Sequence, residues 1–451
     1  MIRNNIQDIL PLLPLQKTML NNSIINRDVE LYKEINCYLI EKQIDEEKIK
    51  IAWEYVIKNN EVLRTVFRWN GLSEPVQIIL CEKECNYTVV NFFENCATGF
   101  FKYVEEVCSK LLKKEFDLEK DLFYITLLKR SDDCAVLVVM NHHILFDGWS
   151  NAMMLEEFYQ YYCDLINNRA VSIRQRKAYK DCVRQNVLEM GKCNTGFWNE
   201  YLSKYIKRDK HLLKPDKRDK NKAIAGFSFN EEVLNRLRRQ AADNRMSIVV
   251  YFYTAWAILL YIYYGDTDVV FGATFSGRPD NMTSCMSLLI NTFPVIVHID
   301  GSTNIQKKLQ ELQDIINSIQ ENRNVSLFEF YKKNKQFDVV SYDSIVVIQN
   351  YPVNNILLTN EYTPVSIYKR YYKSEIDLNM SIQFFAGIQF ELEYNIDKYT
   401  NLDIAGISKM YGDILENILC ADDVADIERM LSKKVEVKKI EFKEFELDEV
   451  F

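Results

Sequence analysis

Two adjacent histidines, His142 and His143, stand in the stretch MNHHILFDGWS, although the chain of 451 residues contains only four histidines. An imidazole without a neighbouring nucleophile can still take or hold a proton while an external amine or hydroxyl attacks an activated carbonyl. No GxSxG motif, which would indicate a nucleophilic serine, is present. Adjacent residues of an extended backbone point to opposite sides, so we expect one histidine to be structural and the other exposed. The alternative is that both are ordinary core histidines.

An aspartate and a glycine follow the pair, at Asp147 and Gly148. A carboxylate at the junction of a strand and a loop is costly to bury alone, so we expect Asp147 to have an arginine partner. A glycine permits a backbone turn and the close approach of a long substrate. No third histidine or carboxylate stands at ligand spacing, and the eleven cysteines include no pair that matches Cys81 and Cys85. We therefore expect no metal site and reduced thiols throughout.

The elements on either side position this stretch. Residues 135–140 (AVLVVM) are an unbroken apolar run, which is typical of a strand buried on both faces. From Ser150, a plausible N-cap, apolar residues recur at spacings of three and four and predict a helix. The histidines are therefore expected at the end of a buried strand, on a loop that leads into a helix. Rigid strand ends with exposed loops are common positions for catalytic residues.

The rest of the chain alternates in the same way, which predicts a mixed α/β fold. The clearest further elements are a buried helix at 247–264, an amphipathic helix at 305–323, and strands at 269–274, 344–349 and 389–394. We predict an N-terminal lobe at 1–177 with the histidine pair, a C-terminal lobe at 178–431, and a charged tail or linker at 432–451.

Composition excludes several classes of protein. A net charge of −8 disfavours nucleic acid as a partner, and the basic stretch 204–222 is either a solvated loop or a contact for an acidic protein. No run of 18 apolar residues and no signal-peptide pattern is present, so we expect no membrane segment and a cytoplasmic location. The start at Met1, nine residues before the first motif, favours a true N-terminus.

The pattern HHxxxDG, here residues 142–148, resembles the signature of the condensation domains of nonribosomal peptide synthetases. Further blocks resemble that family in the same order along the chain. They are LPLLPLQKTML (10–20), EVLRTVF (61–67), YKD (179–181), FW and YL (197–202), FSGRP (275–279), INTFP (290–294) and NYP (350–352). The resemblance extends from residue 10 to about residue 430, nearly the whole chain.

The resemblance implies two lobes, each like chloramphenicol acetyltransferase, arranged in a V with a tunnel between them. Peptidyl carrier domains would insert phosphopantetheine arms from the donor and acceptor sides, so the chain itself would bind no cofactor. The amine of an aminoacyl acceptor would attack an acyl or peptidyl thioester and form an amide. A downstream adenylation domain is a further expected partner.

The resemblance also implies roles for individual residues. His143 would face the amine as a general base or as a positioning group, whereas His142 would be structural. Asp147 would hold the loop through an ion pair, with Arg278 as the first candidate partner and Arg64 as the second. Gly148 would leave room for the acceptor arm. The side chains expected to line the tunnel are Trp149, Ser276, Asn291 and Asn350.

Related families and other functions fit less well. Epimerization domains usually continue as DGVSWR, whereas this chain reads DGWSNAMML, and the DxxxxD pattern of heterocyclization domains is absent. Residues 280–289 form a shortened stretch without the usual GxE element, which leaves the substrate class open. Two alternatives remain: acyl transfer to a hydroxyl or free amine, and a non-catalytic module that recruits a partner enzyme. An intact His143 and Gly148 disfavour the second.

Overall fold

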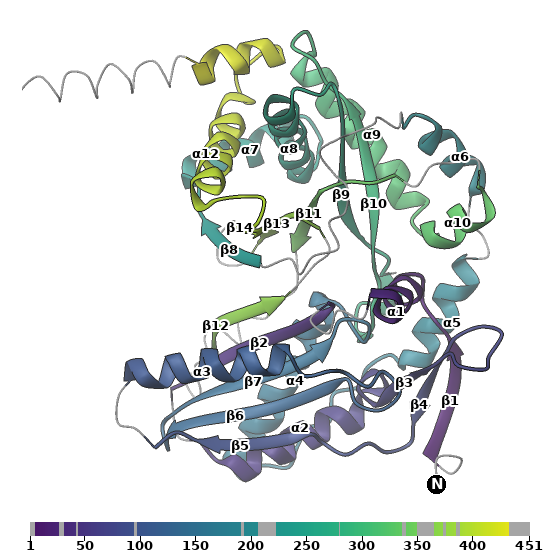
Figure 1. The fold of residues 1–451 in the computed structure, drawn as a ribbon, viewed down its shortest axis with the longest axis vertical. Helices are drawn as coiled ribbons and strands as arrows, with labels where there is room; N and C mark the ends of the chain where they lie inside the picture. Colours follow the sequence, from purple (N-terminus) through teal and green to yellow (C-terminus); the bar gives the residue numbers. More distant parts are fainter. Residues whose placement is uncertain are drawn as a thin grey trace, which may run out of the picture.

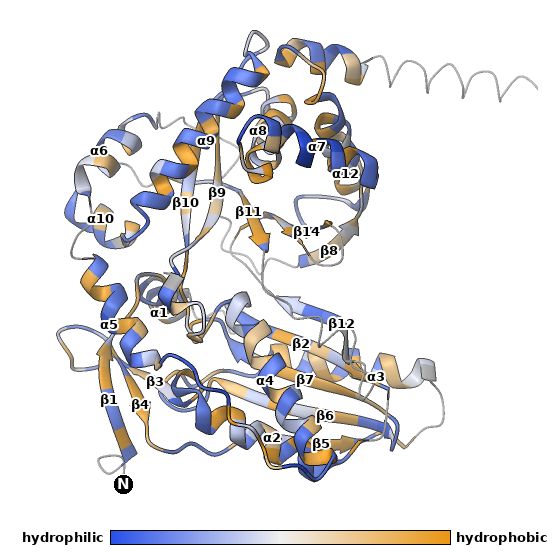
Figure 2. Ribbon diagram, turned by 180° about the vertical axis from the view of Figure 1, so that it is seen from behind, coloured by the Kyte–Doolittle hydropathy of each residue, from blue (hydrophilic) through white to orange (hydrophobic). Residues whose placement is uncertain are grey.

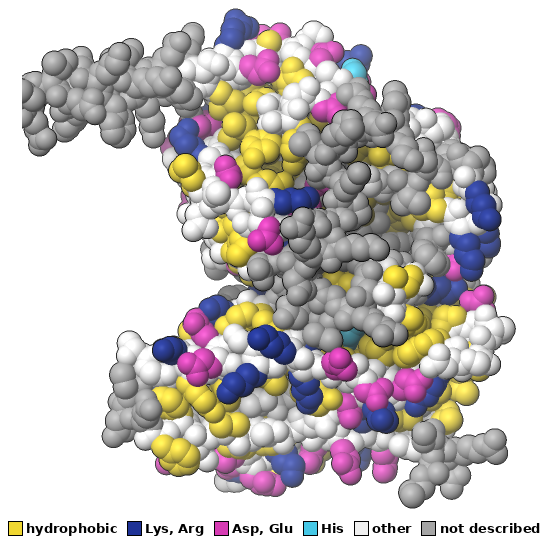
Figure 3. Space-filling view, viewed as in Figure 1, with side chains coloured by type: hydrophobic (Ala, Val, Ile, Leu, Met, Phe, Trp, Pro, Cys, Tyr) yellow, Lys and Arg dark blue, Asp and Glu magenta, His cyan; other side chains and the backbone are white. Residues whose placement is uncertain are grey.

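The computed structural model describes residues 5–26, 31–41, 44–93, 97–190, 194–205, 222–278, 280–335, 340–349, 365–372, 376–384 and 388–432. Most of the basic stretch 204–222, nearly all of the tail 432–451, and Asn350 lie outside these residues. The described part is a mixed α/β fold with two lobes, which are the lower and upper halves of Figure 1. Figure 3 shows the surface hollowed between the lobes at the left of the view.

The lower lobe contains a five-stranded sheet in the order β12-β2-β7-β6-β5. Its strands are β2 (Lys33–Ile40), β5 (Tyr87–Asn91), β6 (Phe123–Ser131), β7 (Cys134–His142) and β12 (Val365–Tyr372). Side chains alternate across the sheet, so Val136, Val138 and Met140 pack toward α3 (Ala97–Leu112). Leu137 and Val139 pack on the other face, in the core that includes α2 (Glu46–Asn59) and α4 (Gly148–Ile166). This double burial explains the unbroken apolar run of β7.

A smaller sheet extends the lower lobe, in the order β1-β4-β3. It is formed by β1 (Ile6–Pro11), β3 (Thr65–Arg68) and β4 (Val76–Leu80), with the 3-10 helix η2 (Glu61–Arg64) before β3. Helix α1 (Pro14–Asn26) follows β1 directly and contacts the upper lobe at β10.

The upper lobe contains a six-stranded sheet in the order β10-β9-β11-β13-β14-β8. Its strands are β8 (Lys222–Phe227), β9 (Asp268–Ser276), β10 (Ile290–His298), β11 (Ser344–Gln349), β13 (Leu378–Gln383) and β14 (Gln389–Asn395). Its helices include α6 (Thr195–Ser203), α7 (Glu231–Asp243), α8 (Ile248–Tyr264), α9 (Ile305–Glu321), α10 (Leu327–Lys333) and α12 (Asn401–Asn417). Helix α8 contacts α7, α9, α12 and β9, and eleven of its residues are buried, which confirms the predicted buried helix. Hydrophilic and hydrophobic segments alternate along α9 in Figure 2, as expected for an amphipathic helix.

Three segments beyond residue 178 contact the lower lobe. Helix α5 (Tyr179–Met190) packs against β1, and residues 282–289 contribute to the core of the lower lobe. Strand β12 pairs with β2 as an edge strand of the lower sheet, with Tyr372 opposite Glu34. The division of the chain at residues 177 and 178 stays a prediction.

Two local expectations are wrong. The N-cap of α4 is Asp147 rather than Ser150, because the Asp147 backbone is extended and its side chain accepts from the Ser150 N–H. Cys182 and Cys285, expected to be reduced, are joined by a disulfide that links α5 to the segment between β9 and β10. These two cysteines are 103 residues apart in the chain, so their pairing depends on the tertiary fold.

Within the described residues, no single helix is long and apolar enough to cross a membrane. Helices α7 and α8 meet the length and composition criteria only as a pair, bent by 114°, and α8 is buried in the upper-lobe core.

Candidate active site

The histidine pair lies where β7 ends and the chain turns toward α4. The His142 N–H donates to the Leu122 carbonyl, and the His143 N–H donates to the Tyr32 carbonyl at 2.7 Å. The buried Gln16 side chain donates to the Ile144 carbonyl at 3.0 Å, so α1 also holds the turn. The loop is therefore fixed on both sides by hydrogen bonds between its own backbone and neighbouring elements.

His142 is enclosed on the α3 side of the sheet. Its ring lies against Tyr32 and Phe116, and only 3% of the residue is exposed. The Nδ1 atom accepts from the Ile144 N–H at 3.1 Å, and Nε2 lies 3.5 Å from the Ser23 hydroxyl. Burial, with smaller contributions from His143 and Lys33, lowers the pKa of His142 to about 3. A neutral, enclosed imidazole of this kind suits a structural role.

His143 lies beyond the end of the strand and is held by one ring nitrogen. Its Nδ1 lies 3.0 Å from the Phe146 carbonyl oxygen, and the His143 ring meets Tyr372 of β12 edge-on at 6.0 Å. A carbonyl oxygen can only accept, so Nδ1 carries the hydrogen in this contact. In the neutral ring, Nε2 then carries the lone pair. The loop therefore presents an imidazole with a fixed tautomer, which is the form that a proton acceptor requires.

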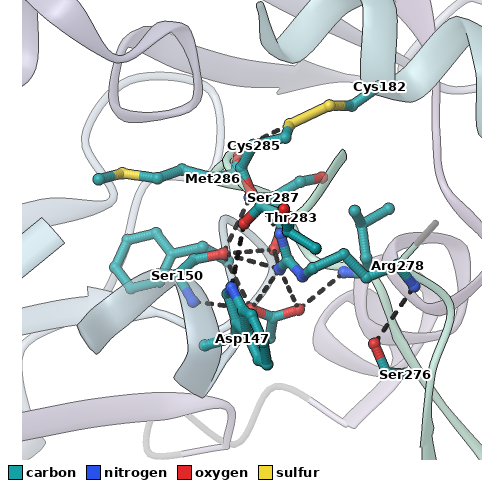
Figure 4. A network of polar contacts seen from close by, with 12 residues as sticks. Asp147, Ser150, Cys182, Ser276, Arg278, Thr283, Cys285, Met286 and Ser287 are labelled. Atoms are coloured by element: carbon teal, nitrogen blue, oxygen red, sulfur yellow. Dashed lines mark hydrogen bonds and ion pairs between the residues drawn. A yellow bond between two sulfur atoms is a disulfide. The ribbon is translucent and has the colours of Figure 1, made fainter. Parts of the chain in front are cut away.

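Asp147 anchors the start of α4 through a buried network, shown in Figure 4. Both of its carboxylate oxygens lie 2.9 Å from Nη2 of Arg278, and the two side chains are 1% and 3% exposed. Asp147 also accepts from the Ser150 N–H, from the Ser150 hydroxyl and from the Leu289 N–H. Every oxygen of the carboxylate is thus used, which compensates for the loss of water on burial.

Arg278 joins this network to the segment between β9 and β10. Its guanidinium donates to the carbonyl oxygens of Cys285 and Ser287, and it lies 5.6 Å from the centre of the Trp149 ring. Gly277 permits the turn, because its N–H donates to the Leu289 carbonyl and a Cβ there would lie 2.7 Å from that oxygen. The segment and the histidine loop are therefore held together as one unit.

The other predicted site residues lie as follows. Arg64 does not contact Asp147; it donates to the Leu80 and Cys81 carbonyls and to Gln7, since η2 places it beside β4. Gly148 is the first residue of α4 and is partly exposed. Trp149 is partly buried and donates to the Thr283 carbonyl at 3.1 Å.

Two polar side chains predicted to line a tunnel are engaged in local contacts. Ser276 ends β9, is exposed, and accepts from the Arg278 N–H at 3.2 Å. The amide of Asn291 donates to the Val325 carbonyl at 2.8 Å and accepts from the Thr292 N–H. Both contacts fix the backbone, and the tunnel itself stays a prediction.

Some contacts of the site could not be predicted from the sequence, although Ser150 itself is one of the predicted N-cap residues. Ser150 and Ser287 complete the network around Asp147, and Glu34 of β2 places Oε1 at 3.1 Å from Nδ1 of His143. Glu34 lies more than a hundred residues before the histidines, and only the pairing of β2 with β7 brings it to them. Among the described residues, no group of three metal-ligating side chains is close enough to hold a metal ion.

Comparison with known proteins identifies the family. The model of the condensation domain matches residues 6–437, so the chain belongs to the condensation domain family. It is 26% identical over 433 residues to a linear gramicidin synthase chain of Brevibacillus parabrevis, covering 94% of this chain and 8% of that protein. It is 27% identical over 365 residues to bacitracin synthase 3 of Bacillus licheniformis, covering 77% of this chain and 6% of that protein. The chain thus spans less than a tenth of the length of these relatives.

Solved structures share the fold. The first condensation domain of the calcium-dependent antibiotic synthetase, in complex with a substrate analogue, matches with a TM-score of 0.75 and 14% identity, covering 93% of this chain and 99% of that one. A four-domain nonribosomal peptide synthetase bound to AMP and glycine matches with a TM-score of 0.79 and 13% identity, covering 93% of this chain and 34% of that one.

Proposed function

We propose that this chain forms an amide bond between an acyl or peptidyl thioester on one carrier domain and the amine of an aminoacyl thioester on another. The observation that supports this most directly is the tautomer of His143. Its Nδ1–H is engaged by the Phe146 carbonyl, so Nε2 is the ring nitrogen with the lone pair. Membership of the condensation domain family supplies the reaction class.

The reaction needs the two thioesters to be held in the correct relative position and one group that accepts the proton of the amine. The acceptor amine attacks the donor carbonyl, a C–N bond forms, and the C–S bond of the donor thioester breaks. The proton lost by the amine passes to His143 Nε2 and leaves with the donor thiol. Holding both thioesters in one site makes the attack effectively unimolecular, which contributes most of the rate. His143 then adds the proton transfer, typically worth about a hundredfold or more.

The partners follow from this reaction. Donor and acceptor would each arrive as a phosphopantetheine thioester on a carrier domain, so the cofactor belongs to the partners and the chain needs none of its own. We place the reaction in the cytoplasm, with an adenylation domain supplying the acceptor amino acid. Residues 276–278, which include Arg278, and residues 281–289, which reach the core of the lower lobe, would form one wall of the path to His143.

The test uses donor and acceptor carrier domains encoded beside this chain, each loaded by its own adenylation domain. Intact mass spectrometry follows transfer of the donor group to the acceptor carrier. His143→Ala is compared with wild type and with His298→Ala, a matched control because His298 is a surface residue at the end of β10 with 63% of its side chain exposed.

We expect wild type and His298→Ala to form product at similar rates. In His143→Ala we expect the rate to fall by about a hundredfold or more. A smaller fall would assign His143 a positioning role. A wild-type protein that binds both loaded carriers without forming product would contradict the proposal and leave a recruitment module as the function.

A further inference from the structure

A carboxylate lies directly behind the proposed base. Oε1 of Glu34 is 3.1 Å from Nδ1 of His143, on the side of the ring opposite the lone pair. The two side chains are 19% and 10% exposed, so little water separates them from each other. Nδ1 already donates to the Phe146 carbonyl, so the tautomer does not depend on Glu34. What Glu34 adds is a negative charge next to the ring.

The carboxylate is held in place by the sheet. Glu34 of β2 stands directly opposite Asn141 of β7, and the Asn141 amide donates to Glu34 Oε2 at 3.0 Å. One oxygen thus faces Asn141 and the other faces His143. Side chains directly opposite each other in an antiparallel pair are close enough to fix one another. The position of the charge is therefore set by the register of β2 and β7.

We propose that Glu34 is a positioning residue that acts through His143: its charge stabilises the protonated imidazole that forms when His143 takes the proton of the attacking nucleophile. A carboxylate within about 4 Å favours the charged form of a histidine, and this gain is present only after the proton has moved. Glu34 therefore contributes to the rate of the proton transfer without contacting the substrate. This inference rests on the proposed function of His143.

Three other titratable groups lie near His143, and each is placed differently from Glu34 relative to the His143 ring. His142 precedes it and faces the α3 side, where its pKa is lowered to about 3, so it stays neutral. Lys33 also faces that side, since its ammonium donates to the carbonyl of Leu111 near the end of α3. Tyr372 of β12 presents its ring edge-on to His143. Glu34 is thus the carboxylate that the sheet places against the ring.

The first measurement is independent of any substrate. The chain contains four histidines, so a protein labelled with ¹³C at histidine Cε1 gives a simple spectrum in which His143→Ala identifies the His143 signal. We expect the titration midpoint of this signal to move to lower pH by about one unit, a tenfold change in proton affinity, in both Glu34→Gln and Glu34→Ala. Glu34→Asp, which keeps the charge, should recover part of the shift. Glu41→Gln, just past the end of the same strand and exposed, is the matched control and should leave the midpoint unchanged.

The second measurement is the condensation assay. With Glu34→Gln, kcat should fall about tenfold near neutral pH with KM within about twofold, and the acidic limb of the pH–rate profile should move to lower pH. An unchanged His143 titration in folded Glu34→Gln and Glu34→Ala would overturn the inference, as would a moved titration with unchanged kcat. If the His143 titration moves in the Glu34 variants but the wild-type protein shows no condensation activity, the electrostatic coupling is supported and the proposed function is refuted.

Discussion

Replacing Asp147 by asparagine tests whether the buried ion pair holds the histidine loop to the segment between β9 and β10. Asparagine keeps the shape of the side chain and is as good an N-cap as aspartate, so α4 loses little. The Arg278 guanidinium, 3% exposed, loses its only charged contact within the described residues. Removing one partner of a buried pair costs about 3–5 kcal/mol, because the remaining charge stays out of water.

We therefore expect Asp147→Asn to lower the free energy of unfolding by about 3–5 kcal/mol, a large part of the roughly 5–15 kcal/mol of a typical protein. Asp147→Ala should cost about 1 kcal/mol more, since it also removes the N-cap contact to the Ser150 N–H. The double variant Asp147→Asn with Arg278→Met should lose about 1–3 kcal/mol less than the sum of the single changes, because no charge is then stranded.

The assay is urea unfolding followed by tryptophan fluorescence and by circular dichroism, with coinciding transitions required before free energies are compared. Glu54→Gln is the control. It breaks the Lys50–Glu54 pair of α2, whose side chains are 44% and 50% exposed, and should change stability by at most about 0.5 kcal/mol. A loss below about 1 kcal/mol in Asp147→Asn, or additive effects in the double variant, would refute the reasoning.

Three further predictions concern the same region. Gly277→Ala should lower the free energy of unfolding by about 1–3 kcal/mol, because its Cβ would lie 2.7 Å from the Leu289 carbonyl oxygen. The control is Gly226→Ala on β8, where a Cβ meets no atom within 4 Å, and it should not destabilise the protein in the same urea assay. The folded protein keeps His142 neutral down to about pH 3, whereas in the unfolded chain the same side chain takes a proton below about pH 6.5. The free energy of unfolding should therefore fall by up to about 1.4 kcal/mol per pH unit as the pH drops from about 6.5 to about 3. His142→Asn, which retains an acceptor for the Ile144 N–H, should remove this part of the acid dependence in unfolding curves measured from pH 7 to pH 4. In the denatured protein, treatment with a reductant before alkylation should increase the number of alkylated cysteines by two, at Cys182 and Cys285. Equal alkylation with and without reductant would contradict the disulfide.

The class of fold could be predicted from local patterns because burial leaves a periodic signature in the sequence. The apolar run at 135–140 became β7, and the segment at 247–264, apolar almost all round, became the buried helix α8. The start of α4 was misplaced by a few residues, since both Asp147 and Ser150 are good N-cap residues and only the backbone angles decide between them.

The sequence by itself determined the alternation of strands and helices, the loop that carries the histidines, and the need for a partner to a buried Asp147. These depend on the properties of neighbouring residues, so they can be read locally. The tertiary structure alone decided that Arg278 rather than Arg64 meets Asp147, that Cys182 lies against Cys285, and that Glu34 stands behind His143. Each of these contacts joins residues about a hundred or more positions apart, and such pairs are chosen by strand register and by the packing of the lobes, which no local pattern records.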